Sequence, residues 1–268
     1  METRIFDFAV IGKTLPDLLE YLDITLLTAF TSIILGSLLG IMLAFAKLSS
    51  KKILSYPAQG YTYIIRCTPS IVLLFIVFYG LPQLADSLFK IDMNNLHRAV
   101  FAIISFTMLF GGYISEVFRA AYLAVPRGQY EAAVCAGLTP LKAFWHILLP
   151  QAALIALPNF GNSTISLLKE GALAYTIGLI DLIGRGNLII AQNFGAFGIE
   201  IYLACMLIYW VLTLSLEYLF SKAETYLAKG HSLHKPQAKS QSWLASLKKY
   251  FPPHRLHNIQ KGGEINGA

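Results

Sequence analysis

Five apolar stretches in this sequence are each long enough to cross a lipid bilayer as a helix. A helix of about 20 residues spans the hydrocarbon core. The stretches cover residues 21–46, 54–79, 97–120, 150–169 and 199–220. Inside a bilayer the backbone satisfies its hydrogen bonds only as a helix or as a closed barrel. We therefore predict an all-α integral membrane protein with five transmembrane helices.

The composition supports this prediction. Of the 268 residues, 56% are hydrophobic and only 13% are charged, and the mean hydropathy is +0.58. A soluble domain of this length carries more charge. We expect most of the buried area to lie against lipid and against neighbouring helices.

Basic residues flank the apolar stretches unevenly, and this bias predicts the orientation. Loops rich in Lys and Arg stay in the cytoplasm. On one side of the predicted helices lie Lys47, Lys51, Lys52, Arg119, Arg127, Lys142, Lys222 and Lys229. The amino terminus is therefore expected outside the cell and the carboxyl terminus in the cytoplasm.

Residues 171–198 are apolar but repeatedly interrupted by glycine. A sixth crossing here would move the carboxyl terminus outside and spoil the charge bias. We therefore predict that this segment is an external interfacial or re-entrant helix, with a sixth crossing as the alternative.

The predicted organisation has three parts: an amino-terminal lead over residues 1–20, a transmembrane domain over 21–228 and a basic cytoplasmic tail over 229–268. The tail carries seven Lys and Arg residues and one Glu, which account for the whole formal net charge of +6. We expect it to be mostly disordered, with a possible short amphipathic helix in SWLASLKKYFPP. Its expected partner is anionic lipid, so the basic balance gives no reason to predict nucleic-acid binding.

A polar cytoplasmic loop over about residues 121–149 carries helix-capping residues at two places. Pro126 can open a short helix, and Gly137 can end it in the left-handed conformation. Thr139 can cap a second helix that has Pro140 at its first position. The two predicted helices meet at a fixed elbow, which suits a rigid projection into a partner. An ordinary connecting loop is the alternative.

Four segments resemble those of ABC importer permeases over about residues 21–228. Glu131-Ala132-Ala133, followed by Gly137, Ile147 and Pro150, is similar to the EAA loop of these permeases. Arg66-Cys67-Thr68-Pro69, GGYISEVFRAAYLAVPRGQ and LPQAALIALPNFGNSTISLLKE resemble segments of the permeases for polar amino acids. The chain departs from the family at Cys67, where glycine is usual, and at Glu170-Gly171-Ala172, where a short polar run is usual.

This resemblance implies a type I ABC importer permease-like fold in the bacterial cytoplasmic membrane. The chain would be the transmembrane subunit of an ATP-driven importer for polar amino acids, working as a homodimer or heterodimer. Its expected partners are ABC ATPase subunits, which would bind ATP and Mg, and an extracytoplasmic solute-binding protein. The residues that the resemblance assigns to ATPase coupling are Glu131, Ala132, Ala133, Gly137 and Pro150.

Charged and helix-breaking residues inside the apolar stretches mark a candidate substrate path. An arginine such as Arg66 is costly in a membrane unless it is paired or faces water, so it either lines the path or has a structural partner. The Lys169-Glu170 pair follows a stretch broken by Pro158 and Gly161, and it is either on the path or a helix-end pair. The candidate path residues are Arg66, Thr68, Pro69, Lys169 and Glu170.

Glu116 and Arg119 are three residues apart, and we predict a local ion pair at the root of the loop. The three cysteines, Cys67, Cys135 and Cys205, have no metal spacing and are expected to be free, packed thiols. We predict no catalytic residue, no metal site and no cofactor in this chain.

Two other function classes fit the sequence less well. A stand-alone secondary transporter or channel would need paired broken helices or an intramembrane carboxylate network. A membrane-bound enzyme would need a clustered nucleophile or metal-ligand set, whereas the six histidines are scattered.

Overall fold

The structure is a computed structural model that describes residues 6–93 and 95–228. No strand occurs within these residues. The chain divides into a first unit, residues 1–227, and a second that begins at Ala228. The basic tail and its predicted amphipathic helix lie outside the described residues, and the membrane helices belong to the first unit.

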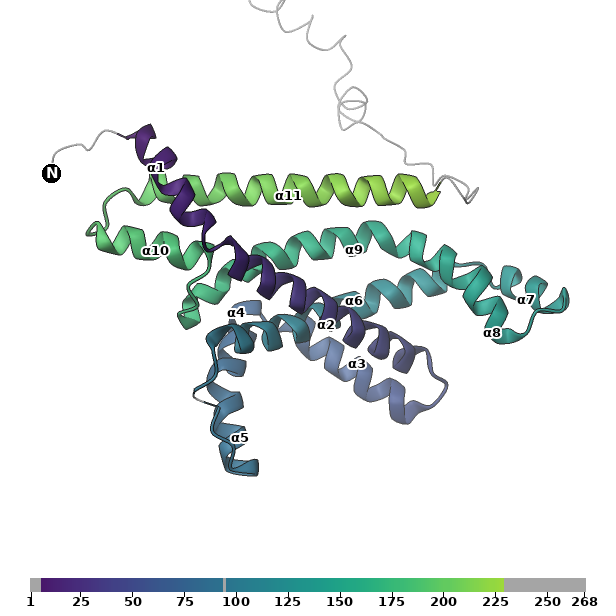
Figure 1. Cartoon of the computed structure of the whole chain (residues 1–268). Helices are drawn as coiled ribbons and strands as arrows, with labels where there is room; N and C mark the ends of the chain where they lie inside the picture. The colour runs from purple at the N-terminus through teal and green to yellow at the C-terminus, as the bar shows by residue number, and fades with distance from the viewer. Residues whose placement is uncertain (1–5, 94, 229–268) are drawn as a thin grey trace, which may run out of the picture. The chain divides into compact units, whose positions relative to one another are not determined.

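Five helical segments are long and apolar enough to cross a membrane, which confirms the predicted number. They are Leu22–Leu48 (α2), Ser70–Phe89 (α4, η1 and α5), Arg98–Ala124 (α6), Pro140–Ile177 (α8 through η3) and Gly198–Ala228 (α11). In Figure 1 the loop helices α7 and α8 lie at one end of the long helices, and α1 and α10 lie at the other.

The predicted bounds of the second crossing, residues 54–79, are wrong. That stretch contains α3 (Lys52–Cys67), a break at Thr68, then α4 (Ser70–Phe75) and the π-helical turn η1 (Ile76–Gly80), which continues into α5 (Leu81–Phe89). Pro69 favours an extended conformation in the residue before it, and Thr68 has ψ 127°. The apolar helix therefore begins after the proline and extends to Phe89.

The core forms where α2 crosses α6, because small residues let the two backbones approach closely. Gly36 and Gly40 of α2 face α6, and Gly111 of α6 faces Leu39. Around this crossing Phe106, Phe110 and Ile114 are almost completely buried. The next helix of the core, α9 (Leu149–Gly171), places the ring of Phe160 within 6.2 Å of the rings of Phe110 and Phe118.

The loop folds as the capping residues predict. Helix α7 (Arg127–Cys135) ends before Gly137, whose φ is +94°, and the N–H of Leu138 donates to the carbonyl of Ala133 at 3.1 Å. Thr139 caps α8 (Pro140–Ala143), which continues through the π-helical turn η2 (Phe144–Leu148) into α9. The predicted elbow between the two loop helices is confirmed.

Residues 171–198 contain no helix long enough to span a bilayer. They form the 3-10 helix η3 (Ala172–Ile177) and α10 (Leu182–Gln192), which has only 11 residues. A helix of that length covers about half of the hydrocarbon core. The alternative of a sixth crossing is therefore wrong for this structure.

An ion pair and apolar packing hold the lead helix α1 (Phe8–Leu19) against α10. Arg185 donates two hydrogen bonds to the carboxylate of Asp17, at 2.9 and 2.7 Å. Leu18 and Leu182 are fully buried beside the first turns of α11. The lead is thus a folded part of the first unit.

The N-cap of α10 is a buried carboxylate. Asp181 accepts a hydrogen bond from the N–H of Gly184 at 2.8 Å and is 1% exposed. Burial raises the pKa of Asp181 to about 6, although hydrogen bonds from the backbone oppose the shift. This carboxylate therefore titrates close to neutral pH.

The α2–α6 crossing can be tested by adding one methyl group. A Cβ at Gly36 would lie 2.9 Å from Phe110 Cβ and 3.1 Å from the carbonyl oxygen of Thr107. Because a backbone group must move, Gly36→Ala should lower the free energy of unfolding by about 1–2 kcal/mol. The melting temperature in detergent should then fall by about 2–8 °C. The matched control is Gly60→Ala in α3, where no described residue would lie within 4 Å of the added Cβ; equal melting temperatures for the two variants would contradict this account.

The Asp181 carboxylate should make stability depend on pH. Its pKa of about 6 in the folded protein lies above the ordinary value of 3.8, so its stabilising contribution is fully present at low pH and is lost as the pH rises through 6. The loss amounts to about 3 kcal/mol. Asp181→Asn keeps the hydrogen-bond acceptor but does not titrate. Thermal unfolding at pH 4.5 and 7.5 should show the variant gaining stability relative to the wild type at the higher pH; a pH-independent difference would refute the assignment.

Candidate functional site

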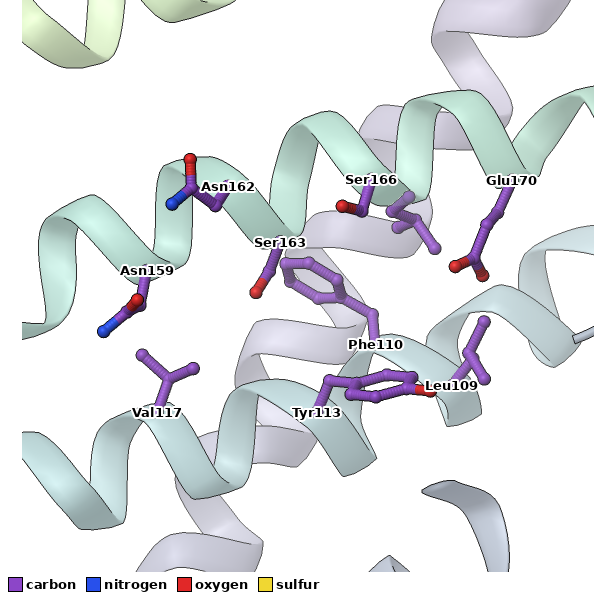
Figure 2. A pocket seen from close by; sticks show the side chains of 10 residues that line it. Leu109, Phe110, Tyr113, Val117, Asn159, Asn162, Ser163, Ser166 and Glu170 are labelled. Carbon is purple, nitrogen blue, oxygen red and sulfur yellow. The ribbon is translucent and has the colours of Figure 1, made fainter. Parts of the chain in front are cut away.

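A polar pocket lies between α6 and α9, with a volume of about 360 Å³. Figure 2 shows the side chains that line it. The apolar members are Leu109, Phe110, Val117 and Leu167, and the polar members are Tyr113, Asn159, Asn162, Ser163, Ser166 and Glu170. A cavity of this size that combines apolar walls with a few polar groups is typical of a small-molecule site.

Helical spacing places these side chains on facing stripes. On α9 the polar residues recur at positions 159, 162, 163, 166 and 170, which is the period of one helix face. On α6, Leu109, Tyr113 and Val117 are each four residues apart. Gly161 is the contact point for Phe220 of α11, and an added Cβ would lie 2.9 Å from that ring. The glycine within the predicted break is therefore used for helix packing.

Glu170 is the charged group of the pocket. In Figure 2 its carboxylate extends from α9 toward α6. Its Oε2 atom is buried and has no hydrogen-bond partner within the described residues. A buried carboxylate oxygen without a donor is costly, so this oxygen is suited to a ligand that brings an N–H group.

Arg66 lies beside the pocket without lining it. Its Cζ is 5.8 Å from the centroid of the Tyr113 ring, and Tyr113 lines the pocket. The guanidinium is therefore a cation–π neighbour of the pocket wall.

Of the five candidate path residues, only Glu170 lines the pocket. The Thr68 hydroxyl donates to the carbonyl of Ile64 at 2.8 Å, Pro69 precedes α4, and Lys169 is exposed. Sequence reasoning missed the other polar lining residues. Their signal was a polar residue every three or four positions in an apolar stretch, which marks a polar face on a membrane helix.

A charge cluster lies at the root of the loop. The predicted Glu116–Arg119 ion pair is confirmed, with Arg119 Nη2 2.8 Å from Glu116 Oε2. Lys47 of α2 completes it, because its Nζ lies 2.8 Å from Glu116 Oε1 and its side chain is 1% exposed. Sequence reasoning used Lys47 only as an orientation signal.

The loop presents a firm exposed surface. Val125, Leu148 and Ala152 form a buried cluster that joins it to α6 and α9, with Tyr130 and Phe144 packed against it. Glu131, Ala132 and Gly137 are exposed, Ala133 is buried, and Pro150 is partly buried in the first turn of α9. Three of the five predicted coupling residues are therefore on the surface.

All three cysteines are free, as predicted, but only Cys205 is packed. Cys67 and Cys135 are exposed at the last turns of α3 and α7.

Comparisons with known proteins identify relatives of this chain. Residues 36–222 match the family model described as binding-protein-dependent transport system inner membrane component. The chain is 35% identical over 229 residues to the L-cystine transport system permease protein TcyL of Bacillus subtilis (strain 168), covering 85% of this chain and 95% of that one. It is 37% identical over 195 residues to the histidine/lysine/arginine/ornithine transport system permease protein HisQ of Salmonella typhimurium (strain LT2), covering 71% and 84%.

A solved structure has the same fold. It is described as the crystal structure of an amino acid ABC transporter with histidines, and the superposition has a TM-score of 0.73 at 31% sequence identity. It covers 83% of this chain and all of the other.

Proposed function

Because this chain belongs to the family of binding-protein-dependent transport system inner membrane components, we propose that the α6–α9 pocket holds an amino acid during its passage across the membrane. The chain is the transmembrane permease subunit of an ABC importer for amino acids, and it is a transport component rather than an enzyme. The observation that carries the proposal is the Oε2 of Glu170, which has no partner among the described residues and lies inside a polar pocket.

The chemistry of the pocket fits a polar amino acid whose ammonium group points toward Glu170. An ammonium group brings the N–H donors that the buried carboxylate lacks. The amide and hydroxyl groups of Asn162, Ser163 and Ser166 are donors for the substrate carboxylate. Arg66 beside Tyr113 supplies positive charge at the edge of the pocket, and the break at Thr68 and Pro69 positions it there. The relatives' names, which include cystine and basic amino acids, support a substrate of this class.

The α7–α8 projection is the proposed docking site for the ATPase. Its exposed Glu131, Ala132 and Gly137 would contact an ABC ATPase subunit that binds ATP and Mg, with Ala133 and Pro150 fixing the projection to the membrane helices. Its elbow at Gly137 is held by backbone hydrogen bonds, so movement of the ATPase would reach α6 and α9 without being absorbed in the loop.

The proposed assembly contains two permease copies, either identical or related, with ATPase subunits and an extracytoplasmic binding protein. It lies in the bacterial cytoplasmic membrane as a multi-pass protein. We place the amino terminus outside and the carboxyl terminus inside, which puts the α7–α8 projection on the cytoplasmic side with the ATPase.

The direct test is reconstitution of the complete importer in liposomes. Uptake of radiolabelled cystine, histidine, arginine and glutamine should depend on ATP and on the binding protein, and at least one should stimulate ATP hydrolysis. If uptake of an amino acid proceeds without ATP and follows an ion gradient, the secondary-transporter class is favoured instead.

The role of Glu170 can be separated from general effects on α9. Glu170→Gln keeps the size of the side chain but removes the charge that attracts the ammonium group. We expect the substrate concentration for half-maximal uptake to rise by about 10- to 150-fold, because a hydrogen bond to a charged group contributes about 1.5–3 kcal/mol. Lys169→Gln is the matched control, since the neighbouring side chain does not line the pocket. Equal effects of the two substitutions would remove Glu170 from the site.

The elbow can be tested at Gly137. This residue has φ +94°, and no described residue would lie within 4 Å of an added Cβ, so the effect of a side chain there is conformational and not steric. A non-glycine residue in the left-handed region costs about 1–2 kcal/mol, and Gly137→Val should reduce ATPase pull-down by about 5- to 30-fold while membrane insertion is unchanged. Gly128→Val is the control, because Gly128 is also uncrowded but has no positive φ. Wild-type ATPase binding by the Gly137 variant would argue against a fixed elbow.

A further inference from the structure

A second polar cavity lies on another side of α6. It has a volume of about 270 Å³ and is lined by Lys47 of α2, Gln59 of α3, and Glu116 and Arg119 of α6. All four residues are charged or carry an amide, in a chain of which only 13% of residues are charged. No residue is shared with the α6–α9 pocket, so the second cavity is a separate site.

Two cations share one carboxylate in this cavity. Lys47 Nζ donates to Glu116 Oε1 and to Ser115 Oγ, each at 2.8 Å. Arg119 Nε and Nη2 lie 2.9 and 2.8 Å from Glu116 Oε2. Both carboxylate oxygens are therefore engaged, and the group retains a net charge of +1.

Partial burial strengthens the electrostatic effect of this excess positive charge. The side chains of Lys47 and Glu116 are 1% and 25% exposed, so solvent screens the excess charge less than it would at the surface. The side chain of Arg119 is 37% exposed. Its guanidinium has five N–H groups, and Glu116 contacts the nitrogens Nε and Nη2. An anion that reaches Arg119 would neutralise the group and find free donors.

Polar residues of α3 lie beside both cavities. Gln59 and Arg66 are seven residues apart, which places them on one helix face about 10 Å from each other along the axis. Both are exposed, and Arg66 lies over Tyr113 in the wall of the α6–α9 pocket. On α6, Glu116 is one turn from Tyr113 toward the α7–α8 projection. Polar groups of α3 and α6 are therefore spaced along the way from the pocket to the second cavity.

We propose that Lys47, Gln59 and Arg119 form a second binding station for the carboxylate of the transported amino acid, between the α6–α9 pocket and the root of the loop. This inference rests on the proposed function of the first pocket. At the station, Glu116 holds the two cations in place and the substrate carboxylate supplies the missing negative charge. Because α6 continues to the loop, a substrate at the station contacts the same helix that leads to the ATPase.

The charge of the station can be measured with a cysteine at Gln59. In the complete importer in liposomes, with Cys67 and Cys135 changed to Ser, Gln59→Cys is labelled with an anionic and with a cationic methanethiosulfonate reagent. The same background without Gln59→Cys corrects for the buried Cys205. The anionic reagent should react faster at position 59, and the ratio of the two rates is the readout.

Two further substitutions, each combined with Gln59→Cys, should change this ratio in opposite directions. Arg119→Gln removes the excess charge and should lower the ratio by about three- to tenfold, whereas Glu116→Gln doubles the excess charge and should raise it by a similar factor. If the cluster presents no effective excess charge to the cavity, the ratio moves in the same direction for both substitutions or not at all. Either of those results would overturn the proposal.

The ligand is tested by protection of the same cysteine. The probes are L-histidine, L-arginine and L-cystine, each compared with its carboxamide. The amino acid that the wild-type complex imports should slow labelling at least threefold, and its carboxamide should not. The labelling rate is also compared between liposomes with and without phosphatidylglycerol. Protection by this anionic lipid alone would assign the cavity to a lipid phosphate and overturn the station.

Failure of the station and failure of the proposed function give different results. A wild-type complex that imports an amino acid, combined with labelling that no amino acid slows, overturns the station and leaves the function in place. A wild-type complex that imports no amino acid overturns both.

Discussion

The close crossing of α2 and α6 is the contact on which the rest of the structure depends. Gly36 and Gly111 bring the two backbones together, and Phe106, Phe110 and Ile114 fill the space around them. Helices α3, α4 and α9 then pack against α6, so α6 has a neighbour on nearly every side. Both cavities lie at the surface of this central helix.

Four charged groups within the spanning helices follow the energetic cost of the bilayer. Lys47, Glu116 and Arg119 are joined in one hydrogen-bonded group, and Glu170 faces a polar pocket. A charged side chain facing hydrocarbon is expensive, so such residues are retained where a partner or a cavity receives them. Under the proposed function, the pocket beside Glu170 is where a substrate passes.

Local signals in the sequence predicted local structure well. The number of spanning helices, the elbow at Gly137 and the Glu116–Arg119 pair all depend on residues that are close in the chain. The partners of Lys47 lie 68 and 69 positions away, and the pocket needs α6 and α9 to face each other, so neither can be deduced from spacing alone. The misplaced second crossing had a local cause, since the effect of Pro69 on Thr68 was outweighed by the continuous apolar character of the segment.

Helix α6 runs for 27 residues without proline, from Arg98 to Ala124, whereas α9 is entered through a π-helical turn and contains Pro158. An unbroken helix is stiff along its axis, so a displacement of one end moves the other end by nearly the same distance. Its neighbour can bend and take up part of the same displacement. The pocket lies between a stiff helix, α6, and a more flexible one, α9. A small motion at the end that carries the α7–α8 projection would therefore slide the two walls of the pocket past each other instead of moving them together.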